Sequence, residues 1–105
     1  MMDPTKKSLK GTHVPQSDHT VNIPSRISDV EDVVWMSKGK KLTFVHEKDF
    51  ELEFVASPVA AGTKKFGPGR KVELVLKDVA THAVCKYTIR AGGVEHDPIV
   101  IIDPN

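Results

Sequence analysis

The sequence has few of the features that would stabilise a small secreted domain or direct a protein to a membrane. A single cysteine, Cys85, among 105 residues excludes an internal disulfide, so the fold cannot depend on that kind of cross-link. No apolar run approaches the roughly 18 residues that a membrane-spanning helix needs. The net charge is only +1, which predicts no general attraction to nucleic acids or acidic membranes. Any electrostatic partner must therefore be recognised by a local group of charges.

The first part of the chain differs in composition from the rest. Residues 1–18 are rich in small polar residues, and Leu9 and Val14 are their only large apolar side chains after the initial methionines. Such a segment buries too little apolar surface to offset the entropy lost on ordering. A disordered tail at 1–18 and one domain at 19–105 are predicted. The tail lacks the apolar segment of a signal peptide, so the expected location is cytoplasmic if the chain is complete, and periplasmic or exported if a leader is missing.

Beyond residue 18, short runs alternate between apolar and polar residues. In FELEF, Phe50, Leu52 and Phe54 share one face, and the run VELVLK at 72–77 includes a second alternating set. A period of two over several runs is typical of half-buried strands. The runs are separated by turn-forming residues: Pro24, Gly39, Pro58, Gly62, the FGPG segment at 66–69 and Gly92 with Gly93. The chain is therefore predicted to be an all-β sandwich of about seven strands.

The segment ISDVEDVV at 27–34 admits two interpretations. Ser28 followed three residues later by Glu31 matches the capping pattern at the start of a helix. The β-branched residues of the segment favour a strand instead, and a strand is predicted there.

The order of the runs resembles that of a known family. The runs are VVWMSKGKKLTFV at 33–45, FELEF at 50–54, FGPG at 66–69 followed by VELVL, KYTIRAGG at 86–93 and DPIVIID at 97–103. In this order they resemble the cupredoxin-like domains, and in particular the small copper-free relatives of the blue copper proteins, over roughly residues 20–104. The resemblance implies a cupredoxin-like Greek-key β-sandwich. An immunoglobulin-like sandwich is the main structural alternative.

The resemblance also implies where a type 1 copper site would lie. Such a site uses two histidines, a cysteine thiolate and a weak axial ligand that is usually methionine. The resemblance aligns Ala91 with the cysteine and residues 40–42 with the upstream histidine, and no methionine follows Met36. It therefore implies a domain that has lost the copper ligands and holds no cofactor. The alternative is a copper-binding or electron-transfer protein with a non-standard ligand set, drawn from His46, His82, Cys85 and His96.

Alternation also predicts which large side chains form the core. Along CKYTIRA at 85–91, Cys85 and Tyr87 fall on the apolar face, so Cys85 is expected to be a buried, unreactive thiol. Trp35 shares a face with Val33 and is predicted to be the large core residue between the sheets. The remaining aromatic residues expected in the core are Phe44, Phe50 and Phe54.

Phe66 lies within a basic segment and differs from the other aromatic residues. The candidate binding residues there are Lys64, Lys65, Phe66, Arg70 and Lys71. An aromatic ring among cations can stack on a base or contact a partner surface. The alternative is that Phe66 closes one end of the sandwich beneath a solvated charged loop. Weak nucleic-acid binding through KGKK at 38–41 and KKFGPGRK at 64–71 is a further alternative, although the near-neutral net charge disfavours it.

The sequence contains none of the common catalytic motifs. There is no Gly-rich phosphate loop between a strand and a helix, no HExxH, no CxxC and no evident pairing of a nucleophile with a base. The chain is therefore expected not to be an enzyme. Its predicted function is that of a non-catalytic cupredoxin-like module with a binding or structural role. The partner is not identified by the sequence, and another protein or a second copy of the chain are the candidates.

Overall fold

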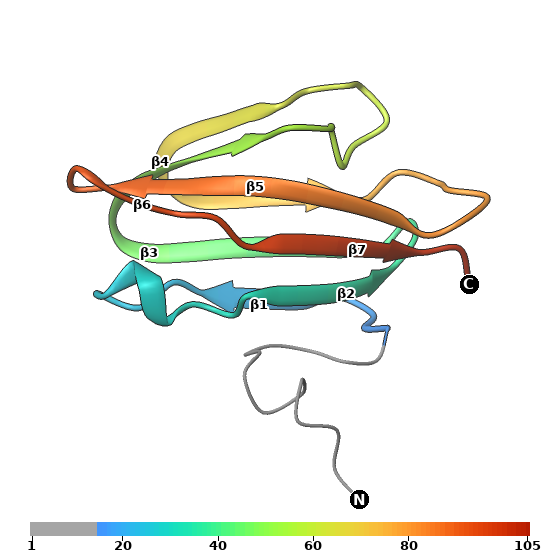
Figure 1. The fold of residues 1–105 in the computed structure, drawn as a ribbon, viewed down its shortest axis with the longest axis horizontal. Helices are drawn as coiled ribbons and strands as arrows, with labels where there is room; N and C mark the ends of the chain where they lie inside the picture. Colours follow the sequence, from blue (N-terminus) through green and yellow to red (C-terminus); the bar gives the residue numbers. More distant parts are fainter. Residues whose placement is uncertain (1–14) are drawn as a thin grey trace, which may run out of the picture.

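The computed structural model describes residues 15–105, which form strands and one short 3-10 turn (Figure 1). The elements are β1 (His19–Asn22), η1 (Ile27–Asp29), β2 (Val33–Ser37), β3 (Lys41–Phe54), β4 (Lys65–Val75), β5 (Ala83–Ala91), β6 (Val94–His96) and β7 (Ile99–Asp103). The predicted all-β class is therefore confirmed, with seven strands and no α-helix in the described part of the chain. The predicted disorder of residues 1–14 lies outside the described residues.

The strands form one mixed sheet that is nearly barrel-shaped. They pair in the order β1-β3-β5-β7-β2, while β4 pairs with β3 and β6 pairs with β5. The pairs β1 with β3 and β2 with β7 are parallel, and the other pairs are antiparallel.

Residues just before β1 connect the two ends of this series of strands. The Gln16 N–H donates to the Trp35 carbonyl at 2.8 Å, and the Gln16 carbonyl accepts from the Ser37 N–H at 2.9 Å. The Lys41 N–H donates to the Asp18 carboxylate at 2.9 Å. Gln16 and Asp18 therefore contact the domain, although both lie in the segment that was predicted to be a tail.

The core is built around three stacked or edge-on aromatic rings. Tyr87 stacks on Phe54 with ring centroids 4.8 Å apart, and it meets Phe44 edge-on at 5.6 Å. All three side chains are at most 2% exposed. Phe50 and Cys85 are buried as well, at 1% exposure each. The alternation in the sequence thus predicted correctly which faces of β3, β4 and β5 point inward.

Trp35 is not the core residue that the sequence analysis predicted. β2 instead buries Val34 and Met36, both 0% exposed, and the half-buried Trp35 lies on the opposite face. Parallel pairing with β7 sets this arrangement, because Val34 lies beside the buried Val100 and Met36 beside the buried Ile102. Both faces of β2 carry apolar side chains, so alternation alone could not decide which face is inside.

The predicted strand at 27–34 is also wrong over its first half. Ile27–Asp29 forms a 3-10 turn, with the Val30 N–H donating to the Ile27 carbonyl at 3.2 Å, and β2 begins only at Val33. Residues three apart share a face in a 3-10 turn but point to opposite faces in a strand. The turn therefore lets Ile27 and Val30 both enter the core, where they are 4% and 1% exposed.

The FGPG segment at 66–69 is not the turn between two strands that its composition suggested. It lies inside β4, and the chain reverses between β3 and β4 over residues 55–64. Gly67 has φ +92°, and a Cβ placed on it would lie 2.6 Å from the Phe50 carbonyl oxygen. Glycine is needed there because the backbones of β3 and β4 approach each other closely.

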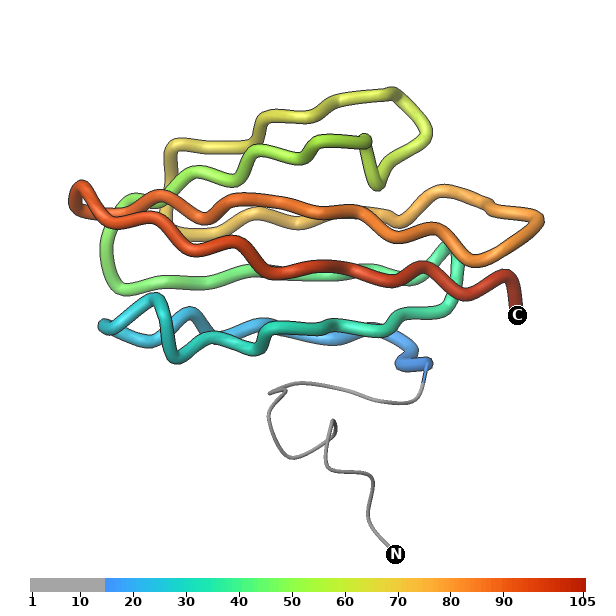
Figure 2. Tube along the Cα trace, viewed as in Figure 1, coloured from blue at the N-terminus to red at the C-terminus, as the bar shows by residue number. Residues whose placement is uncertain are grey.

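β3 is the longest strand and bends between two parts of the sheet (Figure 2). Its first part pairs with β1 over Leu42–Val45 and its last part pairs with β5 over Glu51–Phe54, while β4 pairs with both parts. The register with β4 shifts between Val45 and Phe50. Irregularities of this kind bend a strand and redirect its side chains, and residues 46–48 of this interval line the site described next.

Candidate ligand-binding site

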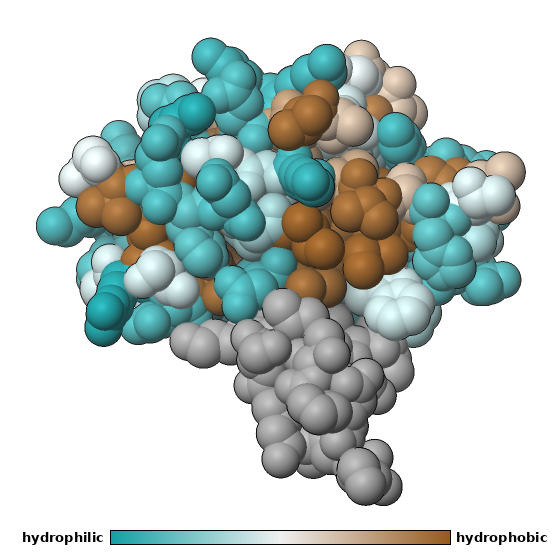
Figure 3. Space-filling model, in the orientation of Figure 1, coloured by the Kyte–Doolittle hydropathy of each residue, from teal (hydrophilic) through white to brown (hydrophobic). Residues whose placement is uncertain are grey.

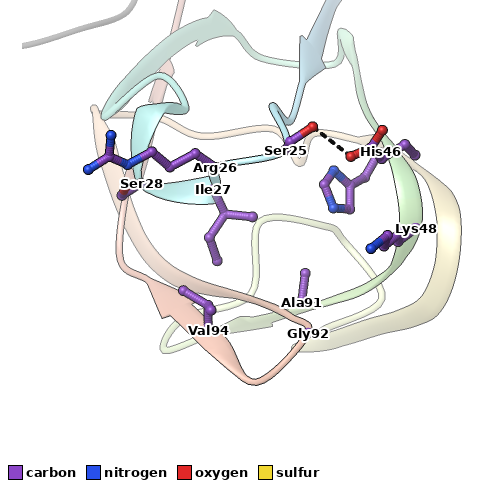
Figure 4. Close-up of a pocket in the computed structure, with 10 residues that line it drawn as sticks. Ser25, Arg26, Ile27, Ser28, His46, Lys48, Ala91, Gly92 and Val94 are labelled. Atoms are coloured by element: carbon purple, nitrogen blue, oxygen red, sulfur yellow. Dashed lines mark hydrogen bonds between the residues drawn. The ribbon is translucent and has the colours of Figure 1, made fainter.

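A pocket of about 430 Å³ opens where β3 bends (Figure 4). Three segments form its wall: the loop and turn at 25–28, residues 46–48 of β3, and the end of β5 with the start of β6. The lining residues are Ser25, Arg26, Ile27, Ser28, His46, Glu47, Lys48, Ala91, Gly92 and Val94.

The His46 ring is fixed by two neighbours. Its Nδ1 lies 3.0 Å from the Ile23 carbonyl oxygen, and the ring meets Phe50 edge-on at 6.1 Å. A carbonyl oxygen only accepts hydrogen bonds, so Nδ1 must carry the proton that is donated. In the neutral imidazole, Nε2 then has a lone pair and accepts hydrogen bonds. Within residues 15–105, no hydrogen bond to this Nε2 is found.

The charged side chains of the pocket are unequal in number. Arg26 and Lys48 supply two cations and Glu47 one carboxylate, so the lining carries a net charge of +1 while His46 is neutral. The Ser25 hydroxyl donates to the Glu47 carboxylate at 2.6 Å, which is the dashed bond in Figure 4. Figure 4 also shows the Arg26 guanidinium directed away from His46, whereas Lys48 lies on the same side of the pocket as His46.

Apolar side chains lie across from His46 and Lys48. Ile27 from η1 is 4% exposed, and Val94 from β6 is 54% exposed at the opening. Figure 4 shows Ile27 and Val94 facing each other, with Ala91 between them and the β3 wall. The pocket therefore combines an apolar side with a polar side, where the His46 acceptor nitrogen and the Lys48 ammonium group lie beside the Glu47 carboxylate.

The four candidate metal ligands lie in different parts of the molecule. His46 is in the pocket. Cys85 is 1% exposed in the core, where burial raises the pKa of its thiol. His96 Nε2 lies 3.2 Å from Asp32 Oδ1, and His82 Nε2 lies 3.0 Å from Asp103 Oδ2.

The two histidines next to β5 are separated by most of that strand. His82 precedes Ala83 at the start of β5, and His96 pairs with Ile89 near its end. Six residues of extended strand span about 20 Å. Across residues 15–105, no group of three or more His, Cys, Asp or Glu side chains is placed to hold a metal ion.

Two of the four cations in the basic segment at 64–71 lie beside acidic side chains. Arg70 lies 3.8 Å from Asp49, and Lys71 lies 3.1 Å from Glu73. Phe66 is half-buried and packs edge-on against Phe54 at 5.8 Å, so its ring covers the core. The other two candidate residues of this segment, Lys64 and Lys65, are exposed.

A second polar cluster lies on the outer face of β2 and β7. Asp103 is 4% exposed and accepts hydrogen bonds from Trp35 Nε1 at 3.0 Å and from the backbone and side-chain nitrogens of Asn105 at 2.9 Å. The backbone N–H of Asn105 contributes most to holding the pKa of Asp103 below its ordinary value. His82 packs edge-on against Trp35 at 6.0 Å. Asp103 thus accepts the hydrogen bond of the indole N–H of Trp35, the residue that had been predicted to lie in the core.

Apolar side chains continue on this outer face. Trp35, Ile101 and Val84 lie side by side on β2, β7 and β5, and Val84 is 55% exposed. Figure 3 shows apolar side chains gathered over β5 and β7 on this side of the molecule. In the described part of the chain, no helix is long and apolar enough to cross a membrane.

Most of the pocket was missed by sequence reasoning. Of its residues, only His46 and Ala91 had been linked to a possible site, His46 as a metal candidate and Ala91 as the position of the copper cysteine. The run HEKD at 46–49 interrupts the alternation of β3, and that interruption was the available signal for a bulge and a nearby site. The segment 25–28 gave no comparable signal, because its place beside β3 depends on long-range packing.

A scan against protein-family models, a search of curated proteins and a search of solved structures each found no match to this chain.

Proposed function

We propose that this chain is a non-catalytic, cupredoxin-like module that binds a small molecule in the pocket formed by 25–28, 46–48 and the β5–β6 turn. The pocket itself carries this proposal. Its volume of about 430 Å³ is within the range of roughly 300 to 1,000 Å³ that is common for ligand sites. An apolar wall with a small number of converging polar groups is also the usual composition of such sites.

The cupredoxin-like part of the proposal is supported by the strand pairing. The immunoglobulin-like alternative is built from antiparallel sheets, whereas β1 with β3 and β2 with β7 are parallel here. Ala91 adds a second argument. The resemblance aligns it with the cysteine of the copper site, and Ala91 lines the pocket together with His46. In this proposal, the pocket takes the place of the copper centre.

The proposal assigns neither a resident metal nor a reaction to the pocket. A type 1 copper site needs a thiolate and two imidazoles in one plane, and the pocket lining includes one histidine and no cysteine. For catalysis by a nucleophile, a serine hydroxyl would give its proton to a well-placed base such as an imidazole. The Ser25 hydroxyl instead bonds to Glu47, whose side chain is exposed to solvent.

A fragment screen followed by amide NMR tests the proposal. Small fragments are added to the full chain, and the shifts of the amides of 25–28, 46–48 and 91–94 are followed. Ala91→Leu fills the pocket from β5, and Ala56→Leu makes the same change at an exposed position outside it. We expect hits whose binding is weakened by Ala91→Leu and unchanged by Ala56→Leu. Hits that bind Ala91→Leu as well as wild type, or a screen without hits, would contradict the proposal.

A further inference from the structure

We infer that the ligand of this pocket is a small 2-hydroxy carboxylate with a short branched alkyl group, an inference that rests on the proposed function and specifies its ligand. Three separate features of the lining point to the three parts of such a molecule: the acceptor nitrogen of His46, the ammonium group of Lys48, and the apolar surface of Ile27, Ala91 and Val94.

The hydroxyl follows from the tautomer of His46. Because Nδ1 donates to the Ile23 carbonyl, the neutral ring offers only the acceptor Nε2 to a ligand. A ligand group that forms a hydrogen bond with this nitrogen must therefore be the hydrogen-bond donor. A hydroxyl group does so without adding positive charge beside Lys48.

The charged side chains of the pocket indicate that the ligand carries a carboxylate. An anion next to Lys48 gains a charge-assisted hydrogen bond, which is stronger than a bond between neutral groups. A ligand with an ammonium group would instead meet a lining with a net charge of +1. The one carboxylate of the lining, Glu47, already accepts a short hydrogen bond from Ser25.

The spacing of the two polar groups favours one small molecule that bonds to both. His46 and Lys48 are two residues apart on β3 and line the same pocket. Figure 4 shows both residues on the β3 side of the pocket. A 2-hydroxy acid carries its hydroxyl and its carboxylate on adjacent carbons, so one compact molecule can reach both side chains.

The apolar wall across from β3 indicates that the ligand carries an alkyl group. Ile27 and Val94 present apolar surface across from β3, and the methyl group of Ala91 leaves the space between them open. A branched group of three or four carbons buries this surface with little loss of rotational freedom, whereas a long chain would extend into solvent past the exposed Val94.

The test uses three matched probes. The first is 2-hydroxy-3-methylbutanoate, the second is 3-methylbutanoate, which lacks the hydroxyl, and the third is 3-methylbutane-1,2-diol, which lacks the carboxylate. Each is titrated into the full chain, and affinity is measured from the amide shifts of the pocket. We expect the hydroxy acid to bind about tenfold or more tightly than either analogue, as the loss of one hydrogen bond to a charged or fixed polar group predicts.

Variants separate the two polar contacts. His46→Asn keeps a side-chain N–H for the Ile23 carbonyl but removes the acceptor Nε2, so it should abolish the preference for the hydroxyl. Lys48→Met keeps the length of the side chain but removes the charge. It should lower the affinity for both carboxylate probes about tenfold and leave the affinity for the diol unchanged. Arg26→Gln is the control, because the Arg26 side chain is directed away from His46, and it should change the affinity for the hydroxy acid less than Lys48→Met does.

The outcomes distinguish the ligand class from the proposed function. Equal binding of all three probes, stronger binding of the diol, or no binding of the hydroxy acid would each overturn the inference about ligand class. If fragments of other chemistry still shift the pocket amides and lose affinity in Ala91→Leu, the proposed function stands without it. If neither the probes nor the fragments bind there, both are wrong.

Discussion

The hydroxyl of Tyr87 should cost this fold stability. Tyr87 is 1% exposed, and its hydroxyl has no hydrogen-bond partner within residues 15–105. The ring itself is well placed, since it stacks on Phe54 and meets Phe44 edge-on. Tyr87→Phe removes the oxygen and keeps both ring contacts. It therefore isolates the energetic effect of one buried polar atom.

The size of the effect follows from desolvation. A buried polar group without a partner costs about 1 to 3 kcal/mol, so Tyr87→Phe is expected to raise the free energy of unfolding by about that amount. In a domain of this size, each kcal/mol corresponds to about 4 to 8 °C in the melting midpoint. Tyr87→Leu is the comparison variant, because it removes the hydroxyl and the aromatic ring together. It should be less stable than Tyr87→Phe.

Alkaline pH gives a second measurement of the same group. Burial raises the pKa of Tyr87 above the ordinary value of 10.0, so only the unfolded chain loses this proton just above that pH. The wild-type protein should lose stability as the pH rises above about 10, and this is the only tyrosine in the chain. Tyr87→Phe should reduce that loss.

Urea and thermal unfolding of the three proteins, at neutral and alkaline pH, measure these effects. A lower melting midpoint for Tyr87→Phe than for wild type would refute the reasoning. It would show that the hydroxyl makes a stabilising hydrogen bond.

Four further variants test other parts of the fold. Cys85→Ser should destabilise by about 1 to 3 kcal/mol, because it places a hydroxyl in the core, and rapid labelling of the native thiol would contradict the burial of Cys85. Asp103→Asn should lower the melting midpoint at neutral pH. The lowered pKa of Asp103 means that its contribution is present above pH 3.8 and is lost as the pH falls further, so an undiminished acid dependence in the variant would be inconsistent with this assignment. Gly39→Ala should cost about 1 to 2 kcal/mol for its positive φ alone, and Gly67→Ala should cost more, because its Cβ would also meet the Phe50 carbonyl. Equal losses for the two glycines would argue against the close approach of β3 and β4.

The inward faces of the strands were predictable wherever only one face is apolar. FELEF in β3 and CKYTIRA in β5 each bury one alternating set and expose the other, so the period of two was sufficient. For β2, the period of two could not predict the inward face, because both its faces are apolar. Which of them is inside depends on the parallel pairing with β7, more than 60 residues away, and no local pattern encodes that pairing.

The pocket was less predictable than the core, for a related reason. Its residues come from three separate segments that meet only because β3 bends and because η1 packs beside β6. Of the residues that line the pocket, the resemblance had named only Ala91. It gave no indication of Lys48 or of the apolar surface of Ile27, because neither lysine nor isoleucine is a ligand in a type 1 copper site.

The tautomer of His46 is the feature on which ligand binding in the pocket most depends. Long-range ¹H–¹⁵N NMR of the histidine rings measures that state directly, with and without 2-hydroxy-3-methylbutanoate. In the free protein, we expect the neutral ring to carry its proton on Nδ1 and to have none on Nε2. The Nε2 resonance should shift on addition of the hydroxy acid in wild type and in Ala56→Leu, and should not shift in Ala91→Leu. A proton on Nε2 in place of Nδ1, or an Nε2 resonance that is unaffected by every bound ligand, would contradict the account.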